Sequence, residues 1–225
     1  MSEQYYAFRT KMQHPSAANL LLAMKEFIRE HQQDTGRSAD ELSEAVQTFF
    51  QQTEDALIQH PLWADCDPEE LEKTCDNVEK FVMTRLHDRA FAVEAEELAE
   101  EARLSEWMRL LHFISPDHLG ISKPFQDLAP WADAQMELCK IVSYKTPRDK
   151  LVCILNCCKR INGSLSQSTS GTHGADEFFP ILIYVLLQSD APQLHSNLRY
   201  ISRFRHPSKL VSEAAYYLTS TDSVP

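Results

Sequence analysis

Glycine is scarce in this chain of 225 residues, which contains only five. All five are predicted to lie between segments of helical periodicity. None belongs to a glycine-rich phosphate loop or to a dinucleotide-binding fingerprint, the two patterns that bring a helix start close to a phosphate. The sequence therefore gives no sign that this protein holds a nucleotide within its own fold.

Positive charge and long apolar runs are also in short supply. The chain has 22 Lys and Arg residues against 33 Asp and Glu residues, which gives a formal net charge of −11. Binding to nucleic acid or to an anionic membrane generally requires a basic surface. No apolar run reaches the length of a membrane-spanning helix. We therefore expect neither a nucleic-acid partner nor direct insertion into a membrane.

The six cysteines and nine histidines do not form a recognisable metal or nucleophile pattern. No CxxC pair is present, and Cys153 and Cys157 have no second pair at zinc-ligand spacing. Residues 1–6 lack the charged-then-apolar order of a signal peptide. We therefore expect no metal, no cofactor and no bond-making chemistry, with buried free thiols in a reducing cytosol.

Helical periodicity is what the chain has in abundance. Residues 1–15 read as a polar lead-in, and residues 163–173 as a polar loop. Ser38 with Glu41 forms a capping box, and Asp67-Pro68 is a second helix start. No segment shows convincing strand alternation. The sequence predicts an all-α fold of about nine helices, near residues 16–33, 38–60, 68–86, 93–113, 127–142, 147–161, 176–189, 192–204 and 210–219.

The predicted helix at residues 93–113 carries six acids, which we interpret as a solvated outer face. These are Glu94, Glu96, Glu97, Glu100, Glu101 and Glu106. Their predicted opposite face is apolar and includes Leu98, Met108 and Leu111.

One stretch organises the chain: two acids, Asp176 and Glu177, stand before the apolar run from Phe178 to Leu187. The run predicts a buried helix, with Pro180 within or just after its first turn. An acid at this point can cap the helix or favour its positive end as a first-turn residue. Alternatively, Asp176 is a solvent-facing carboxylate held at the tip of a rigid helix.

Four ordered motifs near the end of the chain resemble the Vps-nine domain (vacuolar protein sorting, ninth member). They are Pro147–Ile154, Gly174–Val185, Pro192–Ile201 and Glu213–Thr219. Upstream, residues 79–86 resemble the last helix of the bundle that precedes this domain in Rabex-type proteins, and residues 60–63 look most like the plant members. The resemblance implies an N-terminal helical bundle at 1–91 and a layered exchange domain at 92–225.

This resemblance implies a guanine-nucleotide exchange factor for Rab-five-type endosomal GTPases, which would bind the GDP-bound and nucleotide-free forms. Asp176 matches the family's acidic finger, and Tyr216 matches a tyrosine that contacts the switch region. Pro180, Ile181 and Thr219 match further GTPase-binding positions. The family also implies a cytoplasmic protein that is recruited to early endosomes.

The last motif departs from the family pattern. Leu218 and Ser220 replace a Phe and an Asn, and the closing helix of the family is expected to be largely missing here. The alternative hypothesis is therefore a helical adaptor that binds a small GTPase without exchanging its nucleotide. A cysteine- or metal-dependent enzyme is a third, weaker interpretation of the residues.

Overall fold

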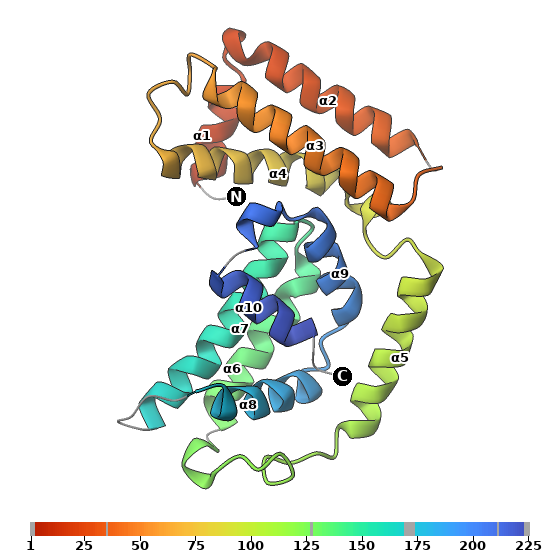
Figure 1. Cartoon of the computed structure of the whole chain (residues 1–225), viewed down its shortest axis with the longest axis vertical. Helices are drawn as coiled ribbons and strands as arrows, with labels where there is room; N and C mark the ends of the chain where they lie inside the picture. The colour runs from red at the N-terminus through yellow and green to blue at the C-terminus, as the bar shows by residue number, and fades with distance from the viewer. Residues whose placement is uncertain (1–2, 35, 127, 169–173, 211, 223–225) are drawn as a thin grey trace. The chain divides into compact units, whose positions relative to one another are not determined.

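The computed structural model describes residues 3–34, 36–126, 128–168, 174–210 and 212–222. Within these ranges, all regular elements are helical: ten α-helices and four short 3₁₀ segments (Figure 1). The predicted all-α fold is therefore confirmed. The chain divides into two compact units, Met1–Val93 and Glu94–Pro225, whereas the resemblance implied a boundary after residue 91.

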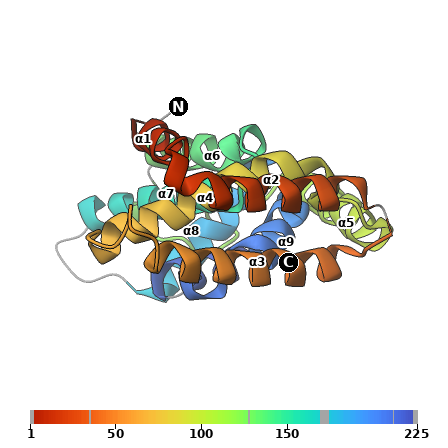
Figure 2. The ribbon, with the colours of Figure 1, turned by 90° about the horizontal axis from the view of Figure 1, so that it is seen from above.

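Unit 1 contains four helices: α1 (Glu3–Met12), α2 (Ala18–Gln33), α3 (Ala39–Ile58) and α4 (Pro68–Ala90). Helices α2, α3 and α4 are neighbours in this unit (Figure 2). Both predicted helix starts are confirmed. The Ser38 side chain accepts a hydrogen bond from the Glu41 N–H, and Asp67 accepts one from the Glu70 N–H at 2.7 Å.

The expectation of a polar lead-in over residues 1–15 is wrong. Helix α1 forms there because Phe8 and Met12, one helical turn apart, are both buried. Only two well-spaced apolar residues on a mostly polar segment are a weak sequence signal for a helix. Packing against α2 and α4 stabilises this helix once the rest of the unit is present.

Unit 2 contains the other six helices: α5 (Ala95–Leu111), α6 (Leu128–Cys139), α7 (Pro147–Ser168), α8 (Ala175–Gln188), α9 (Leu194–Phe204) and α10 (Ser212–Asp222). Helix α7 is longer than predicted, since residues 163–168 continue it. A mid-helix glycine such as Gly163 costs only about 1 kcal/mol relative to alanine. The buried side chains of Ile161 and Leu165 continue the apolar stripe across it. The rest of the predicted loop, residues 169–173, lies outside the described residues.

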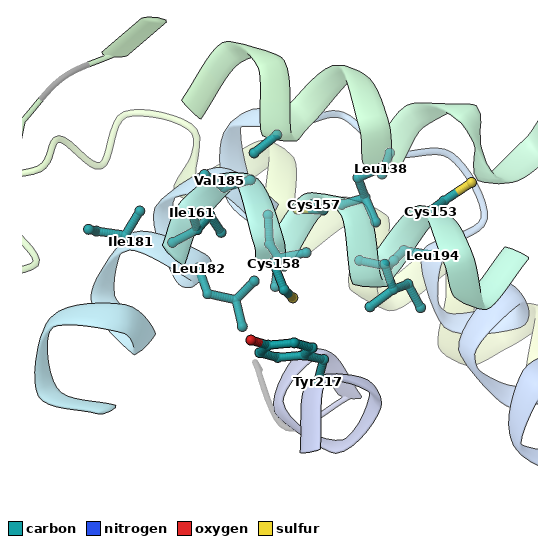
Figure 3. Close-up of a cluster of buried hydrophobic side chains, with 14 of the residues drawn as sticks. Leu138, Cys153, Cys157, Cys158, Ile161, Ile181, Leu182, Val185, Leu194 and Tyr217 are labelled. Atoms are coloured by element: carbon teal, nitrogen blue, oxygen red, sulfur yellow. The ribbon is translucent and has the colours of Figure 1, made fainter. Parts of the chain in front are cut away.

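Helix α7 forms the centre of the unit 2 core (Figure 3). Its buried cysteines pack among apolar side chains of α6, α8 and α9. Burial raises the pKa of Cys153 to about 11 and that of Cys157 to about 12. These thiols are therefore protonated and inert at neutral pH, as expected of core cysteines. Cys66, Cys75 and Cys139 are only partly buried.

The prediction of a solvated face on α5 holds for Glu96 and Glu106, which are exposed, and is wrong for Glu97. Glu97 is buried, and its Oε2 lies 2.8 Å from Nη1 of Arg203 on α9, while Glu94 lies 3.3 Å from Nη2 of the same residue. The Glu101 carboxylate accepts a hydrogen bond from the Ser196 N–H at 2.9 Å. By contrast, Leu98 is exposed. Glu94, Glu97 and Glu101 face α9 because it presents a cation and the N–H groups of its first turn.

A buried lysine joins α7 to α9. The Lys150 ammonium is 1% exposed and donates hydrogen bonds to the Ile141 carbonyl at 3.1 Å and to Oδ1 of Asn197 at 2.5 Å. Burial lowers the pKa of Lys150 from 10.5 to about 8, against a small opposing effect of the nearby Cys153 thiol. Burying the charged ammonium of Lys150 in the core lowers the stability of the fold. This cost disappears when the ammonium loses its proton and becomes a neutral amine.

The pH dependence of stability should show this cost. The folded-state pKa of Lys150 lies below the unfolded value, so between about pH 8 and pH 10.5 only the unfolded chain keeps the proton. Relative to Lys150→Met, the wild-type free energy of unfolding should therefore rise by roughly 3 kcal/mol across this window and fall again as the pH returns below 8. Urea unfolding in reducing buffer measures it.

Lys159→Met, on the same helix, is the matched control. Its side chain is 57% exposed and its ammonium lies 3.8 Å from Glu213 Oε2, so the substitution removes no buried cation and should produce no comparable rise. A flat profile for Lys150→Met as well would show that burial does not oppose the charge on Lys150.

Candidate functional site

The start of α8 carries the two acids singled out by the sequence. Gly174 is the N-cap residue, so neither acid occupies that position. Both lie in the first turn, which was the other predicted possibility. Glu177 accepts a hydrogen bond from the Gly174 N–H on Oε2 at 2.8 Å, as the acid of a capping box does. Glu177, not Asp176, therefore accepts the backbone hydrogen bond at the start of α8.

Asp176 is left free by this arrangement. Its side chain is exposed, and it forms no hydrogen bond or ion pair with any residue that the structure describes. Its position in the first turn places a negative charge at the positive end of the α8 dipole. Four residues on, Pro180 has no N–H to donate to the Asp176 carbonyl. The result is a solvent-facing carboxylate at the tip of a buried helix.

Four aromatic side chains join the first turns of α8 to α10. The ring centroids of Phe178 lie 6.3 Å from Tyr216 and 5.7 Å from Tyr217, and those of Phe179 lie 6.2 Å from Tyr216. Contacts of this kind stabilise by about 0.5–1.5 kcal/mol beyond the area that they bury. We refer to Phe178, Phe179, Tyr216 and Tyr217 as the aromatic cluster. It fixes α10 beside the turn that carries Asp176.

A hydrogen bond fastens the cluster to α7. The Tyr217 hydroxyl accepts it from the Asn162 side-chain amide at 2.6 Å. Burial is the main cause that raises the pKa of Tyr217, so its hydroxyl stays neutral. Figure 3 shows the Tyr217 ring beside Leu182 of α8 and Cys158 of α7. Helix α10 is thus held by both neighbouring helices.

Three of the other predicted site residues are at least partly exposed, and one is buried. Tyr216 is 45% exposed, and Thr219, one turn further along α10, is exposed as well. Pro180 is partly exposed and lies one turn after Asp176 on α8. Ile181 differs from these, because its side chain is fully buried in the unit 2 core. In this conformation it packs α8 against the unit 2 core.

Sequence reasoning did not find the residues that hold this site together. Phe178 and Phe179 belong to the apolar run and were interpreted only as core residues, and Asn162 follows the predicted end of its helix at residue 161. Their partners on α10 lie 37 to 55 residues away in the chain. No local pattern reports contacts across such a separation. The sequence signal that could have pointed to these contacts was the pair of adjacent tyrosines, Tyr216 and Tyr217. In the structure the first is exposed and the second is buried.

The site offers recognition and charge rather than covalent chemistry. Among the described residues, no group of three or more His, Cys, Asp or Glu side chains could hold a metal ion. A cavity of about 320 Å³ lies at the opposite end of α8, lined by Leu186 and Leu187 together with α5 and α9 residues. Over the described part of the chain, no helix is long and apolar enough to cross a bilayer. What remains is the exposed carboxylate of Asp176 on α8 and, on α10, the exposed phenol of Tyr216 and the exposed hydroxyl of Thr219.

Comparison with known families accounts for most of the chain. Residues 131–224 match the family described as the Vacuolar sorting protein 9 (VPS9) domain, which includes α7 to α10. Residues 23–87 match a domain of unknown function (DUF5601), which covers most of α2 to α4.

Known relatives include plant and animal proteins. "Vacuolar protein sorting-associated protein 9A" of Arabidopsis thaliana is 46% identical over 218 residues, which cover 95% of this chain and 42% of the relative. The protein of the same name from Oryza sativa subsp. japonica is 44% identical, over 96% of this chain and 46% of the relative. "Rab5 GDP/GTP exchange factor" of Bos taurus is 30% identical, over 98% of this chain and 45% of the relative.

The chain thus spans less than half the length of each of these three relatives. The match to the family covers the helices that form the exposed site, and the higher identity to the two plant proteins agrees with the resemblance seen in the sequence. Residues 131–224 of this chain therefore belong to the Vacuolar sorting protein 9 (VPS9) domain family.

Proposed function

We propose that this protein is a guanine-nucleotide exchange factor that promotes GDP release from a Rab5-type small GTPase. The observation that supports this most strongly is the exposed carboxylate of Asp176, which has no partner among the described residues although it stands next to a helix start that needs acceptors. A relative with 30% identity over almost the whole chain bears the name Rab5 GDP/GTP exchange factor. A carboxylate that is held at the start of a buried helix and makes no hydrogen bond or ion pair with a described residue is available to act on a partner.

Charge explains how such an acid would release a nucleotide. In the proposed complex, Asp176 enters the nucleotide site of the GTPase. Its carboxylate repels the bound phosphates and competes with them for the lysine of the phosphate-binding loop. It also disfavours Mg²⁺ bound together with the phosphates, because it disrupts their shared coordination. No covalent bond forms or breaks, so the site needs no nucleophile and no metal of its own.

The neighbouring residues provide the binding surface in this proposal. Tyr216 contacts the switch region of the GTPase, and Pro180 and Thr219 flank it on α8 and α10. Because the aromatic cluster ties these helices together, the surface meets the partner already ordered, and less conformational entropy is lost on binding. The protein would bind the GDP-bound form first and the nucleotide-free form more tightly. Recruitment to early endosomes is part of the same proposal.

Release of fluorescently labelled GDP from a panel of purified Rab GTPases tests the function. We expect faster release from Rab5-type members and little effect on distant Rabs, with circular dichroism showing folded protein in each assay. If the protein binds nucleotide-free Rab5-type GTPases but accelerates no release, it is instead a helical adaptor. The departures at Leu218 and Ser220 in the last motif favour that alternative, although Leu218 is buried as a core residue would be.

A further inference from the structure

We propose that Glu177 is a positioning residue for Asp176, and this inference rests on the proposed exchange function. Glu177 closes the first turn of α8 onto Gly174 and thereby keeps the Asp176 carboxylate out of the protein's own hydrogen bonds. Its contact with the Gly174 N–H gives it this task.

The first turn of α8 has more donors than acceptors. The first N–H groups of any helix have no partner within it, and a side chain of the N-cap residue usually accepts from one of them. Here the N-cap residue is Gly174, which has no side chain. The acceptors closest in sequence are the carboxylates of Asp176 and Glu177. Glu177 accepts a hydrogen bond from the N–H of the N-cap residue Gly174 at 2.8 Å, whereas Asp176 accepts none from a described residue, so the two acids differ in their tasks.

Pro180 increases the need for this side-chain bond. A residue at that position would normally donate its N–H to the carbonyl of Asp176, and proline cannot. The turn that carries Asp176 therefore lacks one backbone bond that the following turns have. The rings of Phe178 and Phe179 anchor this turn from the α10 side. Glu177 secures its other end, at Gly174.

Loss of the Glu177 bond would free the Gly174 N–H and leave Asp176 as the adjacent acid able to bind it. A carboxylate that spends time on its own backbone is less available to a partner. The expected consequence is a lower maximal rate of GDP release with the affinity for the GTPase little changed. General destabilisation would instead lower the melting temperature and the affinity together.

Two substitutions separate the bond from the charge. Glu177→Gln keeps an oxygen that can accept from Gly174 and removes the negative charge. Glu177→Asp keeps the charge but is one methylene shorter, so its carboxylate reaches the Gly174 N–H less well. We expect exchange within about twofold of wild type for Glu177→Gln, and a loss on the order of tenfold in maximal rate for Glu177→Asp. The melting temperatures should remain close to that of wild type.

The same two variants in an Asp176→Asn background test whether Glu177 acts through Asp176. There, the maximal rate of the remaining GDP release should be the same for Glu177, for Glu177→Gln and for Glu177→Asp. If Glu177→Gln is as damaging as Glu177→Asp, or if Glu177→Asp lowers the rate equally in both backgrounds, the positioning role is wrong.

Amide hydrogen exchange provides a readout that does not depend on the GTPase. The Gly174 amide should exchange slowly in wild type and in Glu177→Gln, and quickly in Glu177→Asp. If wild type releases no GDP from any Rab, the proposed function falls, and this comparison alone decides whether Glu177 holds the turn. Equal exchange at Gly174 in all three proteins would overturn the inference.

Discussion

Asp176→Asn should remove most of the GDP release while leaving the protein as stable as wild type. The Asp176 side chain is exposed and makes no hydrogen bond or ion pair with a described residue, and Glu177 holds the helix start. The substitution therefore costs the fold almost nothing. It removes the negative charge that repels phosphate and pairs with the lysine of the GTPase. Charge-assisted hydrogen bonds contribute about 1.5–3 kcal/mol, which predicts a roughly 10- to 100-fold loss of kcat/KM.

The matched control is Asp190→Asn, which makes the same exchange at an exposed residue just beyond the other end of α8. Asp190 has a positive φ of 45°, a conformation that asparagine also adopts readily, so this variant should fold and exchange like wild type. Binding to the nucleotide-free GTPase should weaken for Asp176→Asn only. Near-full exchange by Asp176→Asn would show that the charge-based mechanism does not apply to this protein.

Arg203→Met should cause the largest loss of stability, about 3–5 kcal/mol. Arg203 on α9 pairs at 2.8 Å with Glu97 on α5, and the Glu97 side chain is only 5% exposed. Removal of the arginine leaves a buried carboxylate without its cation. That carboxylate must then either stay charged at a high desolvation cost or take up a proton. Urea unfolding measured at neutral pH reports the loss directly.

Two further variants test the interpretation. Adding Glu97→Gln to Arg203→Met removes the stranded charge and should recover much of the lost stability, because a neutral amide is far less costly to bury. Arg103→Met, on α5, breaks only an exposed pair with Glu100 and should cost at most about 1 kcal/mol. If Arg203→Met were as mild as Arg103→Met, the buried pair would not be what fastens α5 to α9.

The sequence by itself determined what depends on neighbours within one helical turn. The starts of α3 and α4 were predicted from Ser38 with Glu41 and from Asp67-Pro68, and the structure has both. Capping works over three residues, so the participants can be read in the sequence. The apolar run after Asp176 likewise identified a buried helix, and the ordered motifs identified the family.

Only the tertiary structure decided which way side chains face when their partners are distant. The acids of α5 were expected in solvent, yet Glu97 is buried and paired with Arg203. That cation lies 106 residues further along the chain, so no local pattern could indicate the pair. Ile181 was expected to be a GTPase-binding residue, and the structure has its side chain buried in the unit 2 core. The aromatic cluster and the Asn162–Tyr217 bond also exist only after α7, α8 and α10 have packed. Local pattern sets which segments become helices, whereas burial and charge pairing between distant segments set which face of each helix is left for a partner.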